Sequence, residues 1–282
     1  MKKITTLHLT MLLFGVIFTQ SACQTADKNN PSAAKSGAVT SVAANNLNDT
    51  IKITTLNYQK DSGCENESQS CAKINLRYFK AEGGHLGVAD SINMQVHNVL
   101  ISILLNTGID SALLAQNKAA KTDIEEAARV FIKDYGNSSK LFGYEAISDT
   151  VFIEILPKHV SIGLSGYIHT GGPHGYDFVS LINLDRQTGR RLQPQDFIAD
   201  EESLVKIAEV YFRKRRELTP DDSLSKSGYF WNNRLFLPTN MALRSDGLYL
   251  HYNPYEIAAY FMGSTEFMIP YSALGNSIKM EW

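Results

Sequence analysis

The sequence is poor in cysteine and in net charge, and it lacks the short motifs of common nucleotide-binding and hydrolytic sites. Its 282 residues include three cysteines, and the formal net charge at pH 7 is −2. So small a charge does not predict the basic face that nucleic-acid-binding proteins carry. The glycine-rich stretches are not followed by the Gly-Lys-Ser/Thr of a P-loop, and we find neither a dinucleotide fingerprint nor a G-x-S-x-G nucleophile elbow.

Long apolar runs are also scarce beyond the N-terminus. There, two lysines precede a mostly apolar run over 7–18, and small residues then lead to Cys23. This pattern is typical of a secretory signal peptide, because the run is too short to cross a bilayer with any margin. A cysteine after small residues resembles a bacterial lipobox, although Gln20 stands where such motifs usually have leucine. We therefore expect a signal peptide over 1–22, lipidation of Cys23 and no other membrane attachment; an ordinary secreted protein is the alternative.

The other two cysteines are predicted to form a disulfide. Cys64 and Cys71 flank the polar loop 65–70, which separates two strand-like runs. In an oxidising compartment outside the cytoplasm, such a pair would staple the end of a hairpin. A metal pair is the weaker interpretation, because no further cysteine is available and no histidine lies close by in the sequence.

The pattern of the remaining chain predicts an α+β protein with antiparallel sheets, packed helices and two sub-domains. Residues 23–48 are polar and aperiodic, as in a flexible tether, and we place domains at 49–157 and 158–282. The predicted strands lie at 51–58, 73–79, 144–156 (one or two strands, broken near 148–150), 160–168, 177–184, 235–237, 241–244, 248–252 and 266–271. The predicted helices lie at 91–106, from the capping box 122–125 to Gly136, and at 201–218.

A basic run, Arg213 to Arg216, ends the last of these predicted helices. Asp200 caps its start, and two glutamates occupy its first turn, so the charges suit the helix dipole. We prefer this interpretation of the run to a surface for nucleic acid or phospholipid.

A shaped loop joins the two predicted strands at the centre of the chain. It contains Gly171, Gly172 and Pro173, and His169 and His174 flank them. Glycine allows backbone angles that are closed to other residues, whereas proline fixes its own φ and restricts the residue before it. The loop is therefore expected to hold both histidines in a defined geometry.

The two histidines also raise the question of catalysis. A metal site at this loop would need a third ligand, such as Asp177 or His251, and a hydrolase would need a serine such as Ser165 or Ser180. The loop does not aim two ligands at one point by regular spacing, and no catalytic set is recognisable. We predict no metal, no cofactor and no enzymatic activity. An envelope hydrolase or deacetylase-accessory protein that uses His169 and His174 is the alternative.

A second stretch, 251–260, places three tyrosines around a proline turn. Aromatic side chains on a rigid backbone are common in protein contacts. These tyrosines could equally cover the core at the point where a strand ends. Both interpretations stay open. The candidate binding residues of the two stretches are His169, Gly171, Gly172, Pro173, His174, Tyr176, Tyr252, Pro254, Tyr255 and Glu256.

Several of these residues carry a resemblance to a known family. The pattern GG-x-HG at 171–175, followed by N-x-D at 183–185 and TG-R at 188–190, resembles the RsiV-like C-terminal domain of unknown function. The run from Leu237-Pro238 to Ile269-Pro270-Tyr271 resembles its second half. Residues 74–78 and Ile92-Asn93 resemble the companion N-terminal domain, which also accompanies the catalytic domain of the peptidoglycan deacetylase PdaC. Pro173 departs from the alanine of many relatives.

The resemblance implies an envelope lipoprotein with a binding module. In RsiV the two domains bind lysozyme, and binding leads to release of a sigma factor. The present sequence has neither an anti-sigma segment nor a deacetylase domain, so neither activity is expected to carry over. The expected ligand is lysozyme or a related muramidase, or peptidoglycan itself, with Asp177 and Glu256 as charged contacts. The expected location is the periplasm-facing envelope, on the outer membrane in a Gram-negative cell.

Overall fold

The computed structural model describes residues 40–41, 50–63, 71–85, 87–105, 122–136 and 143–279. All of them belong to one compact unit, 35–282. The predicted signal peptide, the predicted lipidation site Cys23 and most of the predicted tether lie outside the described residues. Cys64 also lies outside them. Cys71 is disulfide-bonded, and its pairing with Cys64 stays a prediction that peptide mapping of the unreduced protein can test.

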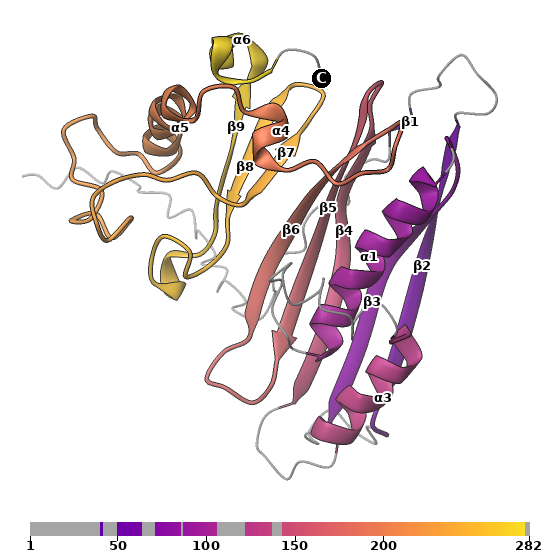
Figure 1. Cartoon of the computed structure of the whole chain (residues 1–282). Helices are drawn as coiled ribbons and strands as arrows, with labels where there is room; N and C mark the ends of the chain where they lie inside the picture. The colour runs from indigo at the N-terminus through magenta and orange to yellow at the C-terminus, as the bar shows by residue number, and fades with distance from the viewer. Residues whose placement is uncertain are drawn as a thin grey trace, which may run out of the picture. The chain divides into compact units, whose positions relative to one another are not determined.

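The first layer of the fold is a six-stranded sheet with two helices against one face (Figure 1). The strands run in the order β2-β3-β4-β5-β6, and β1 pairs with the far end of β4. The strands are β1 (Thr40–Ser41), β2 (Ile51–Asp61), β3 (Ala72–Gly83), β4 (Tyr144–Ile155), β5 (His159–His169) and β6 (Tyr176–Asp185). The helices are α1 (Val88–Leu105) and α3 (Ile124–Tyr135). One continuous core of apolar side chains lies between these helices and the sheet.

The α+β class is confirmed, but the large sheet is mixed rather than antiparallel. β3 pairs with the first half of β4 in parallel, whereas β2–β3, β4–β5 and β5–β6 are antiparallel. Parallel neighbours need a long crossover, and here the chain between β3 and β4 contains α1 and α3.

Helix α1 is apolar where the sheet and α3 pack against it. By length and composition alone it would suit a membrane span, with a mean hydropathy of 1.2. In the fold, however, Ile92, Val96 and Leu100 are buried in the core shared with the sheet and α3. Burial in a protein core selects the same side chains as lipid does, so the composition of α1 is explained by its packing.

The second layer is a three-stranded antiparallel sheet, β7-β8-β9, with helix α5 and several short helices around it. Its elements are α4 (Pro194–Phe197), α5 (Glu201–Arg215), β7 (Asn240–Leu243), β8 (Gly247–Tyr252), η2 (Tyr260–Met262), β9 (Thr265–Pro270), α6 (Tyr271–Leu274) and η3 (Gly275–Ser277). A separate aromatic core fills this part, with Phe197, Phe212 and Phe230 fully buried.

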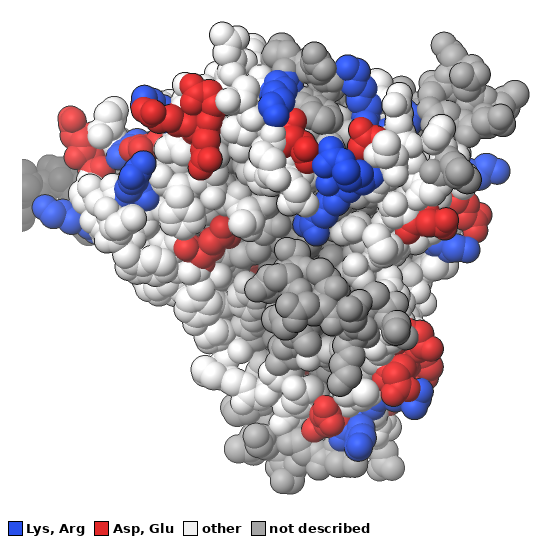
Figure 2. Space-filling model, viewed as in Figure 1, with Lys and Arg blue, Asp and Glu red and all other residues white. Residues whose placement is uncertain are grey.

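The basic run at the end of α5 does more than complement the helix dipole. Arg213, Arg215 and Arg216 all donate hydrogen bonds to neighbouring segments of the chain. On the face drawn in Figure 2, basic and acidic side chains of the described residues are interspersed. The predicted helix runs to 218, but α5 ends at Arg215, since Glu217 has a φ of 56° that no α-helix accommodates.

Four local predictions need correction. Residues 235–237 form no strand, although Leu235 is buried; the first strand of the second sheet begins at Asn240. Asp123 rather than Thr122 caps α3, because its side chain accepts from the N–H of Glu126.

β4 is one strand whose pairing with β5 shifts between Thr150 and Phe152, so the predicted break is a bulge. Helix α1 begins at Val88, three residues before its predicted start.

The large sheet is continuous across the predicted boundary at 157/158. β4 and β5 are antiparallel neighbours joined by a short turn there. The two cores divide further along the chain, between Leu184 of the first and Leu192 of the second.

Candidate binding surface

The two loops that the sequence singles out meet in space. The hydroxyl of Tyr255 lies 3.3 Å from Nε2 of His174, although 81 residues separate them in the chain. The ring of Tyr260 stacks on the His174 ring with 3.8 Å between centroids and 15° between planes. We call His174, Tyr255 and Tyr260 the His–Tyr cluster.

Glycines let the central loop fold closely over tyrosine rings. A Cβ at Gly175 would lie 2.3 Å from the ring of Tyr167 in β5, so a larger residue there would push that ring aside. Gly171 has a φ of +87° and lies against the ring of Tyr144. Glycine therefore allows close packing on the Tyr167 ring at Gly175 and the left-handed backbone conformation at Gly171.

The two histidines do not converge on a common point. The ring nitrogens of His169 lie 2.6 Å from the carbonyl oxygen of Gly143 and 3.1 Å from that of Gly172. Nδ1 of His174 lies 2.8 Å from the carbonyl oxygen of Gly175. His169 thus ties the loop to the start of β4, while His174 presents its ring to the tyrosines. The described residues contain no group of three or more His, Cys, Asp or Glu side chains that could hold a metal ion.

The turn that carries Tyr255 is fixed to the edge of the large sheet. The side-chain amide of Asn253 accepts from the N–H of Val179 at 2.8 Å and donates to its carbonyl oxygen at 3.1 Å. This imitates the pairing of a neighbouring strand along β6. Tyr255 has a φ of 69°, a strained conformation for a side chain of its size. The rigid turn holds Tyr255 outward.

Carboxylates lie beside the cluster. Asp177 is exposed, pairs directly opposite Tyr167 and accepts from the Tyr260 hydroxyl at 3.4 Å. Glu256 accepts from the backbone N–H of Asn253 at 2.9 Å, and burial raises the pKa of its carboxyl group. Burial, and after it the charge of Asp177, raises the pKa of Tyr260, so its hydroxyl stays a hydrogen-bond donor at neutral pH.

The candidate binding residues differ in their exposure to solvent. Gly172, Pro173, His174, Tyr176 and Tyr255 are exposed, and Gly171, His169 and Glu256 are half-buried. Pro254 is buried beneath the turn.

Tyr252 belongs to the core rather than to a binding surface. It is fully buried, donates a hydrogen bond to the carbonyl oxygen of Phe236 at 2.6 Å and packs edge-to-face with Phe230. Tyr260 and Asn253 are absent from the predicted set, although both shape the cluster. In the sequence, nothing distinguishes Tyr260 from the other tyrosines of this stretch. The Asn253-Pro254 pair indicates a turn but not a contact with β6.

Comparisons with known proteins connect this chain to a domain family. Residues 194–272 match the family described as "Protein of unknown function (DUF3298)". The peptidoglycan-N-acetylmuramic acid deacetylase PdaC of Bacillus subtilis (strain 168) is 24% identical over 204 residues, which are 67% of this chain. The chain spans 43% of the length of that relative.

Two solved structures share the fold. A DUF3298 family member from Bacteroides fragilis superposes with a TM-score of 0.64 at 17% identity, over 82% of this chain and 95% of its own. One from Pseudomonas aeruginosa gives 0.62 at 23% identity, over 83% and 97%. These two likenesses confirm the α+β fold. The match over 194–272 and the similarity to PdaC support the predicted domain family, whereas the RsiV-like assignment and the lipid anchor stay predictions.

Proposed function

We propose that this chain is an exported, lipid-anchored, non-enzymatic binding protein of the bacterial envelope. Its ligand in this proposal is a protein of the lysozyme type, held at the His–Tyr cluster. One observation carries the proposal: the exposed rings of His174 and Tyr255 come from two separate loops and are held together. The distant similarity to a peptidoglycan deacetylase supports an envelope-related role.

The construction of the two loops favours recognition. Gly175 packs on Tyr167, and Asn253 is bonded to Val179, so the cluster is largely ordered before a ligand arrives. Such preorganisation lowers the entropic cost of association. Tyrosine is enriched at protein interfaces, and the exposed carboxylate of Asp177 suits a cationic partner, chiefly through the association rate.

Peptidoglycan is the second candidate ligand, favoured by the similarity to PdaC. Tyrosine rings also stack on sugars, so the exposed rings alone do not separate the two ligands. A hydrolase at the two histidines is less well supported, because carbonyl oxygens occupy both ring nitrogens of His169 and Nδ1 of His174. Turnover of purified peptidoglycan by the protein would favour the hydrolase.

The anchor is tested at Cys23. Substitution Cys23→Ala removes the thiol that would carry the lipid, so we expect the protein to leave the membrane fraction or to accumulate as an uncleaved precursor. Fractionation after a high-salt wash, with the unmodified protein as control, measures this. A variant that is processed and still sediments with membranes would refute lipid anchoring.

The ligand is tested at the cluster. We expect Tyr255→Ala and His174→Ala each to weaken binding of a c-type lysozyme about tenfold or more, because exposed rings at the centre of an interface carry much of its affinity. Calorimetry measures the affinity, and thermal melting controls for folding. Met94→Ala, which truncates a half-exposed side chain on α1, is the matched control and is expected to bind like the parent.

Three results would redirect the proposal. If both variants melt at lower temperatures but still bind lysozyme at low temperature, Tyr255 and His174 have a structural role and do not contact the ligand. No binding by the parent would remove the lysozyme-type ligand. Co-sedimentation of the parent with peptidoglycan, lost in Tyr255→Ala, would replace it with the glycan.

A further inference from the structure

A second group of large side chains is exposed next to the His–Tyr cluster. Trp231, Phe236 and Phe261 expose 69%, 44% and 86% of their surfaces. They lie on two segments that are bonded together: Tyr229 bridges to Ala258, and the N–H of Phe230 donates to the carbonyl oxygen of Ile257 at 2.7 Å. The start of the segment 229–236 is therefore bonded to residues 257–258, which directly follow the turn that carries Tyr255.

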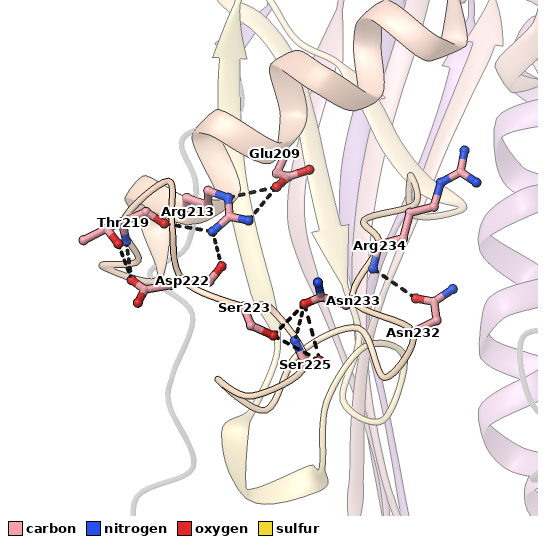
Figure 3. A network of polar contacts seen from close by, with 9 residues as sticks. All are labelled: Glu209, Arg213, Thr219, Asp222, Ser223, Ser225, Asn232, Asn233 and Arg234. Atoms are coloured by element: carbon pink, nitrogen blue, oxygen red, sulfur yellow. Dashed lines mark hydrogen bonds and ion pairs between the residues drawn. The ribbon is translucent and has the colours of Figure 1, made fainter.

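The loop that leads to Trp231 is braced by a polar network (Figure 3). The guanidinium of Arg213 binds the carboxylate of Glu209 at 2.7 Å and donates to the carbonyl oxygens of Thr219 and Asp222. The carboxylate of Asp222 in turn accepts from the N–H and the hydroxyl of Thr219. One partly buried arginine thus fixes both ends of the turn 219–222.

Asn233 fixes the tip of the same loop. Its Oδ1 accepts from the hydroxyl of Ser223 at 2.8 Å and from the N–H of Ser225 at 3.1 Å (Figure 3). Its own N–H donates to the carbonyl oxygen of Phe230 at 2.6 Å and closes the turn that contains Trp231. Phe230 and Asn233 have φ angles of 47° and 58°, so the turn is strained and depends on these bonds.

Arg216 joins this loop to the one beyond η2. Its guanidinium lies 5.1 Å from the centre of the Tyr229 ring and donates to the carbonyl oxygen of Ser264 at 2.7 Å. Arg216, which directly follows α5, therefore contacts both segments that carry the exposed aromatic side chains.

We propose that Trp231 is a second anchor of the interface formed by the His–Tyr cluster, and that the partner is a folded protein; this rests on the proposed function. An exposed tryptophan on a strained, braced turn is unfavourable in water, and a braced aromatic side chain suits insertion into a partner's pocket. Tryptophan and arginine are the residue types that dominate protein interfaces. Arg234 is exposed, and its guanidinium extends away from the network in Figure 3, where its backbone N–H donates to Oδ1 of Asn232 at 3.2 Å.

These features describe the contacted part of the partner. It presents an apolar depression that receives the indole ring, bordered by a carboxylate that pairs with Arg234. A protein is favoured over a glycan because two of the three exposed rings, Phe236 and Phe261, carry no polar group for sugar hydroxyls and offer a broad apolar surface instead.

The experiment compares Trp231→Ala with Val210→Ala, which truncates a 66% exposed side chain on α5. Calorimetry against a c-type lysozyme is expected to show at least tenfold weaker binding for Trp231→Ala, parental affinity for Val210→Ala and parental melting temperatures for both. Asn233→Ala is expected to weaken binding as well, because it frees the turn. Asn233→Asp keeps the Oδ1 acceptor and is expected to restore most of the affinity.

The outcomes separate this inference from the proposed function. If Tyr255→Ala loses binding and Trp231→Ala keeps it, the second anchor is refuted and the proposed function stands. If Trp231→Ala loses only co-sedimentation with peptidoglycan, the partner is a glycan and the inference is wrong. If the parent binds no lysozyme, both fail together.

Discussion

Replacing Phe212 with alanine is expected to lower the free energy of unfolding by about 3–5 kcal/mol, the usual cost of removing a buried phenylalanine ring. Phe212 is fully buried on α5. Its ring packs edge-to-face on Tyr229, Phe230 and Tyr252, with 5.0 Å between the centroids of Phe212 and Phe230. The truncation leaves a cavity that these rings cannot fill without disturbing the turn of Trp231.

Equilibrium urea unfolding measures this effect as a shift of the midpoint at constant slope. Val210→Ala, two positions earlier on the same helix, removes an exposed side chain and is expected to stay within about 0.5 kcal/mol of the parent. Equal stabilities of the two variants would mean that the aromatic core of the second layer contributes little to folding.

Periodicity in the sequence predicted the elements because each period reflects one buried face. Ile74 and Leu76 alternate with exposed residues in β3, and both are buried against the helices. The hairpin that Asp246-Gly247 indicates is confirmed, because Leu243 and Leu248 pair across that turn. These signals are local, and the residues that produce them lie within a few positions of one another.

Which distant strands pair with each other in the sheet could not be predicted from periodicity. The pairing of Ala72 with Tyr144 is parallel because two helices intervene, and nothing in the pattern of either strand specifies its neighbour. The expected antiparallel arrangement is therefore wrong for β3 with β4 and for β1 with β4, and right for the hairpins.

The candidate binding surface shows the same limit at the level of single residues. Tyr252 ends a strand and points into the core, whereas Tyr255 follows a turn and points to solvent, although both belong to one aromatic stretch. Their roles differ because the turn at Asn253 reverses the chain, which composition does not reveal. The contact between Tyr255 and His174 depends on how the two layers pack.

That packing depends on a buried polar seam, and Asn183 is its centre. The Nδ2 group of Asn183 donates to the carbonyl oxygen of Met241 at 2.8 Å, and its Oδ1 accepts from the N–H of Leu243 at 2.9 Å. Oδ1 also accepts from the hydroxyl of Ser161 at 2.9 Å. A side chain of β6 thus supplies β7 with the hydrogen bonds that a neighbouring strand would give.

We expect Asn183→Ala to lower the free energy of unfolding by about 2–4 kcal/mol, because it leaves the buried backbone groups of Met241 and Leu243 without these bonds, at roughly 1–3 kcal/mol each. Ser161→Ala is the matched control. It removes the one hydroxyl proton that Oδ1 of Asn183 and the carbonyl oxygen of Leu243 share. Oδ1 of Asn183 still accepts from the N–H of Leu243, and that carbonyl oxygen still lies 3.1 Å from Nε2 of His159. The control is therefore expected to cost about 1 kcal/mol.

Urea unfolding and lysozyme binding, measured together, test what the seam does. If the seam holds β7 and β8 in position, Asn183→Ala weakens binding at temperatures where the protein is still folded, because Asn253 and Tyr255 follow β8 directly. Ser161→Ala is expected to bind like the parent. Unchanged stability in Asn183→Ala would show that water replaces the lost bonds and that apolar contacts alone join the two layers.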